Sequence, residues 1–569
     1  MKPVISVCLS LVVFCCVSFA PSSSRNLPAP LATIDSGPLE GAYFGASPNE
    51  VMFLGIPYAA PPIADRRWKP PQPVAKWQGA RKADAYGAAC PQAEDPHQQE
   101  ITKEMIQTFE PYFTYRTDED CLYLNLWTTN LPTAPRRAAR LPVMIWIHGG
   151  GNVTGSSQVP PMGPTLARKG VVLVSINYRL GALGFLAHPV LTAESPHNAS
   201  GNYGILDQIA ALEWVQRNIA QFGGDPANVT IFGESAGGAN VCHLTVSPLA
   251  RSLFQRAILE SNTCSDYLHP ELKTPASYEG GVGTSEDIGL RLVRDLSVAG
   301  GPDALAKLRT ISSQELIAAS ARDPALNFDA TVDGWVLTEQ PATTLAQGRQ
   351  TKVPVIVGSN SDEGTTMVEE DFRVAPTLAN YKAFLKSEFV NDENAEEVFR
   401  TYPAATDADV RPAFIAFDTD YGFGFSTYRF AVNAARAGQK TWYYYFTYTA
   451  KAQPRYAGKG AFHGIETKFL AGWFHPSWWG EPDAEDKKLV DLMTGYWTQF
   501  AKTGDPNGPG LPPWPVYDPK TNLALEIGHE IKLRPTPHVD RFAIFERSLN
   551  GRLATIPKSG QGPDKIPKK

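Results

Sequence analysis

The sequence has little excess charge and no long apolar run beyond residue 20, and each shortage excludes a class of protein. Its 52 basic and 58 acidic residues give a formal net charge of −6, which argues against nucleic-acid binding. After residue 20, no run reaches the ~18 apolar residues that a membrane-spanning helix needs. Apolar residues make up 43% of the chain and charged residues 19%, so the composition is globular rather than disordered.

The common metal and nucleotide motifs are also missing. The sequence contains no H-E-x-x-H, no paired C-x-x-C, no P-loop and no G-x-G-x-x-G after a strand. No internal repeat is visible either, which argues against a solenoid or a propeller. We therefore expect a reaction that requires no cofactor and no metal.

The N-terminus has the pattern of a secretory signal. Lys2 precedes an apolar run over residues 4–20, and small residues follow it. This pattern predicts a signal peptide over residues 1–22, with an uncleaved anchor as the alternative. The mature protein is expected to be secreted or periplasmic, without a membrane span.

The cysteines fit an oxidising compartment. Three of the seven lie in the signal segment and leave with it. The other four are Cys90, Cys121, Cys242 and Cys264. An even set of this size permits two disulfides with three possible connectivities.

Apolar runs alternate with helical patterns through much of the chain. Residues 141–147 and 171–176 are nearly continuous apolar runs, which is typical of parallel strands covered by helices on both faces. Two long helical stretches, 285–320 and 381–438, are expected to cap the upper face of the sheet. The alternation predicts an α/β fold.

The domain organisation follows from this pattern and from the tail. Large α/β folds with insertions reach this length around one sheet, so we expect a single domain over residues 23–555. Residues 556–569 are rich in Pro, Gly and Lys and are expected to form a disordered tail.

A Gly-Glu-Ser-Ala-Gly segment at 233–237 is the centre of the functional prediction. It lies between a β-prone run, 229–232, and a segment of helical spacing, 236–246. The glycines permit a tight turn, and a serine at a helix N-terminus meets a partial positive charge that favours a developing anion. The motif alone is weakly specific, and a plain loop is about equally frequent.

A glycine run follows the apolar strand at 141–147. His148-Gly149-Gly150-Gly151 holds three consecutive glycines, each of which costs conformational entropy, whereas a plain flexible turn needs only one or two. Together with the serine, the run favours an oxyanion hole in which backbone N–H groups converge on one oxygen.

Acyl transfer by serine also needs a base and an acid that orients the base. Ser235, Glu363 and His463 follow the chain order of α/β-hydrolase triads, and the two later residues lie in glycine-flanked loops after expected strands. Asp362 is the rival acid; we prefer Glu363 and interpret Asp362 as a structural turn residue.

Several longer motifs resemble the type-B carboxylesterase family, which includes bacterial esterases, cholinesterases and some lipases. The resemblance runs from about residue 30 to 550. The matching segments are EDCLYLN (119–125), HGGG (148–151), NYRLG (177–181), GNYG (201–204), FGGDP (222–226), GESAGG (233–238), SDEG (361–364), HG (463–464) and TGDPN (503–507).

The resemblance implies an α/β-hydrolase fold with a large, mixed but mostly parallel central sheet, flanking helices and helical cap insertions. It assigns the nucleophile, base and acid to Ser235, His463 and Glu363. It further implies that the backbone N–H groups of Gly150, Gly151 and Ala236 form the oxyanion hole. Two polar partners near the histidine are also implied, namely Glu234 and Ser261.

The cysteines match the family only in part. Cys90 and Cys121 correspond to the family's first disulfide. The usual second disulfide pairs a cysteine near position 264 with one just downstream, and no such residue exists here. We therefore expect Cys242 to pair with Cys264.

Other departures bear on the substrate. Asn152-Val153 stands where many relatives have aromatic residues, so we expect a more polar wall beside the oxyanion hole. The loop between Cys90 and Cys121 has no tryptophan, which disfavours a choline ester because cation–π attraction is best with Trp. The aromatic residues after the histidine are candidates for either a gorge lining or ordinary packing: Trp473, Phe474, Trp478 and Trp479.

The prediction is a secreted serine carboxylesterase that acts on a small-molecule ester through an acyl-enzyme. The alternatives are a lipase for longer-chain esters and a non-catalytic, cholinesterase-like binding protein. The intact set of serine, histidine and acid argues against the latter. We expect a monomer by default.

Overall fold

The computed structural model describes residues 27–93, 116–132, 139–261, 264–273, 283–298, 303–323, 326–372, 374–389, 392–451, 455–474 and 480–556. The expected signal segment lies outside these residues, as does all of the expected tail except residue 556.

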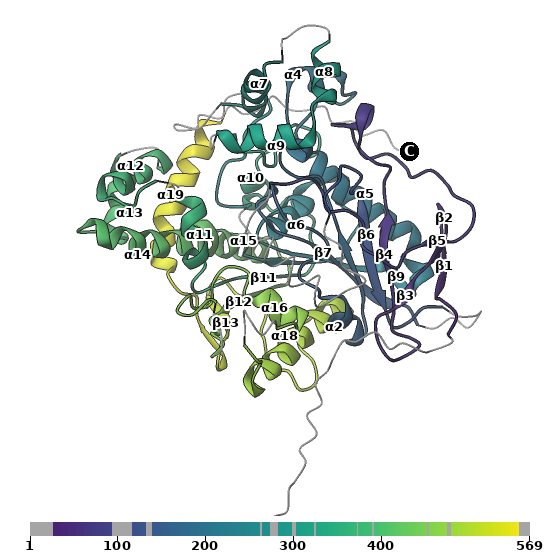
Figure 1. Ribbon diagram of the computed structural model, residues 1–569. Helices are drawn as coiled ribbons and strands as arrows, with labels where there is room; N and C mark the ends of the chain where they lie inside the picture. Colours follow the sequence, from purple (N-terminus) through teal and green to yellow (C-terminus); the bar gives the residue numbers. More distant parts are fainter. Residues whose placement is uncertain are drawn as a thin grey trace, which may run out of the picture.

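An 11-stranded sheet runs through the molecule (Figure 1). Its strands, from one edge to the other, are β14 (Ile531–Pro535), β13 (Leu523–Ile527), β12 (Thr441–Phe446), β11 (Val355–Asn360), β10 (Arg256–Glu260), β9 (Gly224–Glu234), β7 (Leu141–Ile147), β8 (Val172–Ile176), β6 (Tyr123–Thr128), β4 (Val51–Pro57) and β3 (Ala42–Tyr43). Neighbours from β13 to β8 pair in parallel, and the outer pairs are antiparallel. The sheet is therefore mixed and mostly parallel.

A second, small sheet lies beside the β3 edge (Figure 1). It consists of β1 (Leu31–Ile34), β2 (Gly37–Glu40) and β5 (Arg81–Lys82). β1 and β2 pair antiparallel, and β5 joins β2 in parallel.

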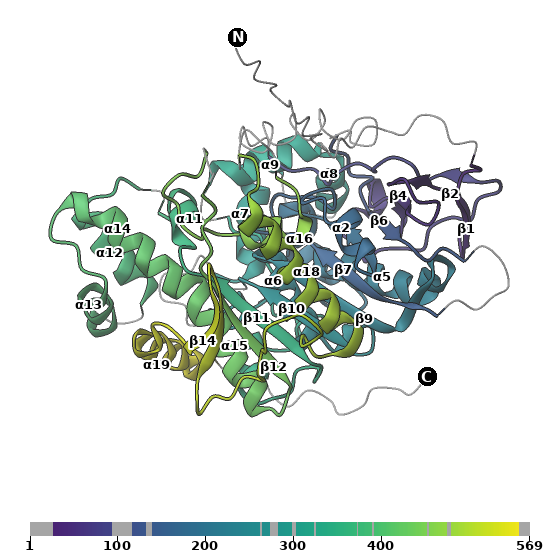
Figure 2. The same ribbon diagram turned by 90° about the horizontal axis from the view of Figure 1, so that it is seen from below.

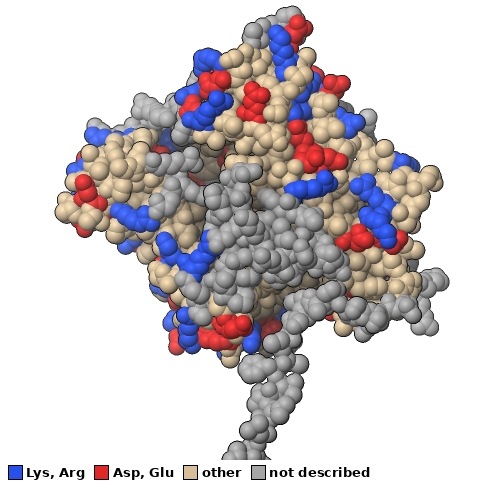
Figure 3. Space-filling view, in the orientation of Figure 1, with Lys and Arg blue, Asp and Glu red and all other residues tan. Residues whose placement is uncertain are grey.

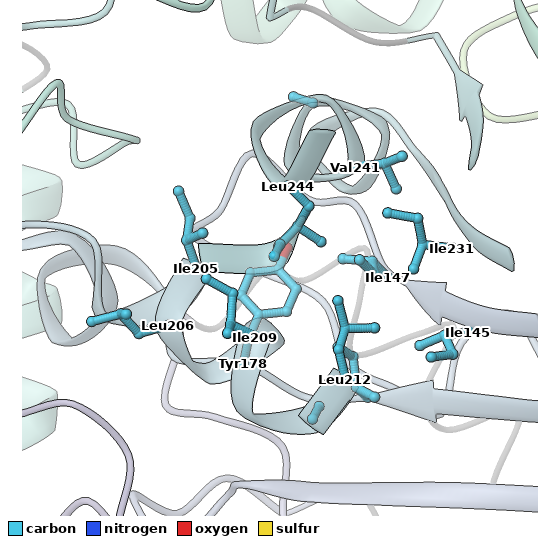
Figure 4. Packing of buried hydrophobic residues seen from close by; sticks show 14 of the residues in the cluster. Ile145, Ile147, Tyr178, Ile205, Leu206, Ile209, Leu212, Ile231, Val241 and Leu244 are labelled. Carbon is cyan, nitrogen blue, oxygen red and sulfur yellow. The ribbon is translucent and has the colours of Figure 1, made fainter. Parts of the chain in front are cut away.

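Helices cover both faces of the large sheet because its middle strands are apolar on both sides. Val143, Ile145 and Ile147 of β7 belong to the core shared with α5 (Tyr203–Asn218) and α6 (Ala236–Val246). Figure 4 shows this packing from close by. The alternate residues Met144 and Trp146 point to the other face. They join the core of α2 (Gly163–Arg168), α16 (Glu466–Ala471) and α18 (Ala484–Thr503), which Figure 2 shows in front of the sheet.

The ends of α18 illustrate how local sequence sets helix boundaries. Asp483 accepts hydrogen bonds from the N–H groups of Glu485 and Asp486, which satisfies two free donors of the first turn. The helix ends at Thr503 and is capped by Gly504, whose φ of 77° suits glycine rather than a residue with a side chain.

The remaining helices lie around the sheet, above it and to one side (Figure 1). They are α3 (Gly181–Phe185), α4 (Pro189–Glu194), α7 (Ser285–Asp295), α8 (Ala304–Thr310), α9 (Ser313–Arg322), α10 (Pro341–Ala346), α11 (Gly364–Asp371), α12 (Leu378–Glu388), α13 (Asp392–Thr401), α14 (Asp407–Asp418), α15 (Phe425–Arg436) and α19 (Val539–Thr555). One part of the second helical stretch is not a cap: Phe430 and Ala431 of α15 pack with Val357 and Tyr443 of the sheet.

Four neighbouring parallel strands end at one edge of the sheet, and the predicted site residues follow them. Ser235 comes directly after β9, Ser261 directly after β10, His148 directly after β7, and Glu363 three residues after β11. The register pairs the last residues of β9 and β10, and β11 continues two residues beyond the partner of the last residue of β10. Ligands of open α/β sheets bind at this carboxyl edge.

Two disulfides are present in the described chain. Cys90 is bonded to Cys121, and Cys242 of α6 is bonded to Cys264, with Cα–Cα distances of 5.0 and 6.1 Å. Within the described residues, no helix combines the length and apolar character that crossing a membrane would demand. Lysines and arginines are interspersed with acidic residues on the face shown in Figure 3.

Candidate active site

The turn at Ser235 is held in a strained backbone conformation. Ser235 has φ 59° and ψ −129°, which is rare for a residue with a side chain. Its N–H donates to the carbonyl oxygen of Glu260 over 3.0 Å, and α6 begins at the next residue. A Cβ at Gly237 would overlap the carbonyl oxygen of Ile147, so only glycine allows this turn to lie against β7.

Glu363 and His463 form a direct hydrogen bond, with 2.6 Å between Nδ1 and Oε2. Glu363 is fully buried, and its other oxygen, Oε1, accepts from Ser261 Oγ at 2.6 Å and from the Asn360 N–H at 2.7 Å. In the neutral imidazole, an acceptor of this kind places the proton on Nδ1 and leaves the lone pair on Nε2. This hydrogen bond leaves Nε2 as the ring nitrogen that can accept a proton.

The Nε2 atom of His463 lies beside the serine turn. It is 3.2 Å from Oε1 of Glu234, the residue immediately before Ser235. The ring of Phe423, in the π-helical turn Thr419–Gly424, covers the imidazole at a centroid distance of 4.4 Å. Burial opposes charge on the imidazole, but the carboxylates of Glu234 and Glu363 outweigh it and raise the pKa of His463 above its ordinary value. Burial raises the pKa of Glu234 as well.

Asp362 has a different set of contacts from Glu363. Its N–H donates to the carbonyl oxygen of Ala461 over 3.1 Å, and its Oδ2 accepts from the Ala461 N–H at 3.0 Å. These bonds fasten the segment that carries His463 to the turn that carries Glu363. His463 lies after β12, which ends at Phe446, and residues 447–462 intervene between the strand and the histidine.

The glycine run lies against the serine turn. A Cβ at Gly149 would come 2.7 Å from the carbonyl oxygen of Glu234 and 3.0 Å from Cβ of Ser235. Gly150 and Gly151 follow with φ of 100° and 60°. Ala236 is the first residue of α6, where an N–H has no intrahelical acceptor. Within the described chain, no hydrogen bond uses the N–H of Gly150, Gly151 or Ala236.

A group of buried carboxylates near the histidine was missed in the sequence. Glu260 accepts from Trp497 Nε1 at 2.8 Å, and burial raises its pKa to about 8. Glu466 accepts from Asn360 Nδ2 at 2.6 Å, and burial likewise raises its pKa. The only sequence signal for Glu260 is a charged residue that directly follows the short apolar run 257–259. Phe423 lies in a sequence cluster of aromatic residues, but nothing in the sequence indicates that its ring covers His463.

Two of the four aromatic residues after the histidine, Trp473 and Phe474, lie within the described residues. Phe474 contacts Phe469 edge to face, with centroids 5.6 Å apart, and both Trp473 and Phe474 pack against the core on the α16 face. These contacts favour the packing interpretation for these two residues. Trp478 and Trp479 lie outside the described residues, as does most of the loop between Cys90 and Cys121.

Comparison with known proteins gives the family of the chain. The sequence profile of the Carboxylesterase family matches residues 28–543. The chain belongs to the carboxylesterase family. It is 37% identical over 506 residues to a fumonisin B1 esterase of Sphingopyxis macrogoltabida, covering 86% of each chain. It is 32% identical over 544 residues to a liver carboxylesterase of Sus scrofa, covering 91% of this chain and 93% of that one.

A solved structure of a PNB esterase is also similar to this carboxylesterase. The TM-score is 0.74 at 29% identity, and the match covers 90% of this chain and 99% of the other. The α/β-hydrolase fold is thus confirmed, and the protein is a carboxylic ester hydrolase.

Proposed function

We propose that the protein is an exported serine carboxylesterase that forms an acyl-enzyme on Ser235. The observation that carries the proposal is the hydrogen bond from His463 to the buried Glu363, which leaves Nε2 facing the residue next to Ser235. A base oriented by an acid beside a serine in a sharp turn is the arrangement that activates a hydroxyl for acyl transfer.

In the proposed reaction, Ser235 Oγ attacks the ester carbonyl while His463 Nε2 takes its proton. Glu363 keeps the other proton on Nδ1 and stabilises the imidazolium. The oxyanion of the tetrahedral intermediate accepts from the N–H groups of Gly150, Gly151 and Ala236, the first two from the glycine run and the third from α6.

The intermediate then collapses with cleavage of the C–O bond to the alcohol. His463 gives its proton to the departing alkoxide, and the acyl group remains on Ser235. Water next attacks the acyl carbonyl while His463 takes one of its protons. As this second intermediate collapses, the bond to Ser235 Oγ breaks, His463 returns the proton to Oγ, and the carboxylic acid is released.

The substrate class follows from the family: a small-molecule carboxylic ester. The likeness to a fumonisin B1 esterase makes fumonisin B1 a compound to include in a substrate panel. Soluble esters of graded acyl length, compared with an emulsified triglyceride, would separate this proposal from a lipase.

Export and domain organisation belong to the same proposal. Two disulfides lie in the described chain, and bonds of this kind persist in oxidising compartments. We infer that residues 1–22 direct secretion or periplasmic export and that residues 23–555 form the catalytic domain.

Covalent labelling tests the nucleophile. A fluorescent alkyl phosphonate should label the native protein but not Ser235→Ala, and hydrolysis of p-nitrophenyl butyrate should fall by roughly 10⁶ in kcat for Ser235→Ala or His463→Ala. Ser312→Ala is the matched control, because Ser312 caps the peripheral α9. Equal labelling of native protein and Ser235→Ala, or losses below about tenfold, would refute the assignment.

A further inference from the structure

Asn152, directly after the glycine run, is built into the protein interior rather than into an open wall. Only 2% of its surface is exposed. Its φ is 57°, so it continues the left-handed conformation of Gly150 and Gly151, with φ of 100° and 60°. A residue with a side chain rarely adopts this conformation, although asparagine does so more readily than most. Three such residues in succession need an anchor.

The Asn152 side chain supplies that anchor by contacts at both ends. Its Nδ2 donates to Asp329 Oδ1 over 2.7 Å, and its Oδ1 accepts from Asn240 Nδ2 over 2.8 Å. Its backbone carbonyl oxygen accepts from the N–H of Gly181 at 2.7 Å. Asp329 is itself held, because its Oδ2 accepts from the Tyr267 hydroxyl at 2.9 Å.

The bond to Asn240 joins the two halves of the proposed oxyanion hole. Asn240 lies on α6 four residues after Ala236, so the two residues share a face of the helix, and Asn240 is fully buried. Gly150 and Gly151 lie immediately before Asn152. A hydrogen bond from Asn240 to Asn152 therefore fixes the position of the glycine run relative to the first turn of α6.

We propose that Asn152 is a positioning residue, clamped between Asp329 and Asn240, that holds the N–H groups of Gly150 and Gly151 in register with that of Ala236. The inference rests on the proposed function, since it concerns the same oxyanion hole. Its physical basis is that donors stabilise a transition state only when they are aimed in advance at the developing charge.

A substitution that adds a negative charge tests the clamp without changing side-chain size. Asn152→Asp places a carboxylate against that of Asp329, so repulsion replaces the hydrogen bond. We expect kcat for p-nitrophenyl butyrate to fall roughly 10- to 100-fold with KM within about threefold, because the donors are misplaced rather than removed. The affinity for a trifluoromethyl ketone, whose serine adduct carries an oxyanion, should fall by the same factor.

The second substitution should restore the contact. In Asn152→Asp/Asp329→Asn, the new amide can donate to the carboxylate at position 152 while its oxygen accepts from Tyr267. We expect kcat and inhibitor affinity within about threefold of the native enzyme. Such a recovery requires that positions 152 and 329 are energetically coupled, because two independent substitutions would not compensate each other. Asp329→Asn alone keeps an acceptor for Asn152 and should also stay close to native.

Two further variants complete the test. Asn198→Asp is the matched control, because Asn198 is an exposed asparagine with φ 50°. Its substitution should change neither kcat nor the affinity for the trifluoromethyl ketone. Asn240→Ala leaves the bond to Asp329 but cuts the link to α6, and should lower kcat and inhibitor affinity together by about tenfold. It carries the test if Asn152→Asp does not fold.

The outcomes distinguish the two proposals. If Ser235→Ala is inactive while Asn152→Asp and Asn240→Ala keep native kcat and inhibitor affinity, the clamp is refuted and the acyl-enzyme proposal stands. If Ser235→Ala keeps its activity, the acyl-enzyme proposal fails first. A loss of activity that the exchanged pair does not recover would also overturn the clamp.

Discussion

Replacement of Glu363 by glutamine tests the role of the acid with almost no change in shape. The Oε1 atom of Glu363 accepts from Ser261 Oγ and the Asn360 N–H, and its Oε2 accepts from His463 Nδ1. In Glu363→Gln, the amide oxygen keeps the first two donors. The amide nitrogen, itself a donor, must then face Nδ1.

The expected magnitude follows from this geometry. Because the amide nitrogen donates to Nδ1, the imidazole proton moves to Nε2, and the base no longer has a lone pair for the serine proton. A wrong tautomer in an otherwise intact triad lowers kcat by roughly 10⁴. All the local hydrogen bonds remain satisfied, so the unfolding free energy should change by only about 1 kcal/mol.

The assay is steady-state hydrolysis of p-nitrophenyl butyrate, together with thermal unfolding of the same samples. Glu485→Gln is the matched control, because Glu485 also accepts from a histidine Nδ1, that of His529, over 2.8 Å, but on an exposed surface. A kcat for Glu363→Gln within tenfold of native, with the fold intact, would show that the acid does not set the tautomer.

Three further substitutions have defined outcomes. Glu234→Gln removes a carboxylate that raises the pKa of His463. Because activity requires the neutral imidazole and is lost as pH falls through that pKa, the acid limb of the kcat/KM profile should move down by roughly one pH unit. A limb that stays where it is in the control variant Glu530→Gln would contradict this. Ser235→Gly should abolish activity yet raise the unfolding free energy by about 1 kcal/mol, because glycine adopts φ 59° without strain. In the same denaturant-unfolding measurement, Ser235→Ala should show no such gain. Cys242→Ala/Cys264→Ala opens a loop of 22 residues and should lower the unfolding free energy, measured by denaturant unfolding, by roughly 3 kcal/mol. If dithiothreitol destabilises the double variant as much as the native protein, the bond between Cys242 and Cys264 does not supply this stability.

The sequence predicts the strands and the serine turn because their signals are local. Continuous apolar runs such as 141–147 can be satisfied only by burial on both faces, and the structure places this strand between two helical layers. The glycines around Ser235 permit a turn, with φ 59° at the serine, that few other sequences can adopt. These features depend on residues within about ten positions of one another.

Contacts between distant segments were not predictable in the same way. Phe423 covers His463 from a π-helical turn, and Asp329 reaches Asn152 across 177 positions. The sequence around either residue contains no periodicity or turn signal that names its partner. The helical stretch 381–438 was expected to cap the sheet, but α15 packs on the sheet face because its apolar stripe meets Tyr443.

The serine turn also shows why the flanking glycines are required. Glycine is often chosen for φ above zero, yet Gly237 is helical, and its substitution is excluded by the carbonyl oxygen of Ile147 instead. The same carbonyl would block a Cβ at Gly233. Both glycines therefore let the turn approach the end of β7, where the glycine run begins, and that approach brings Ser235 beside Gly149. The strain at Ser235 persists because the turn is fixed from both sides, by β7 through this packing and by β10 through the bond to Glu260.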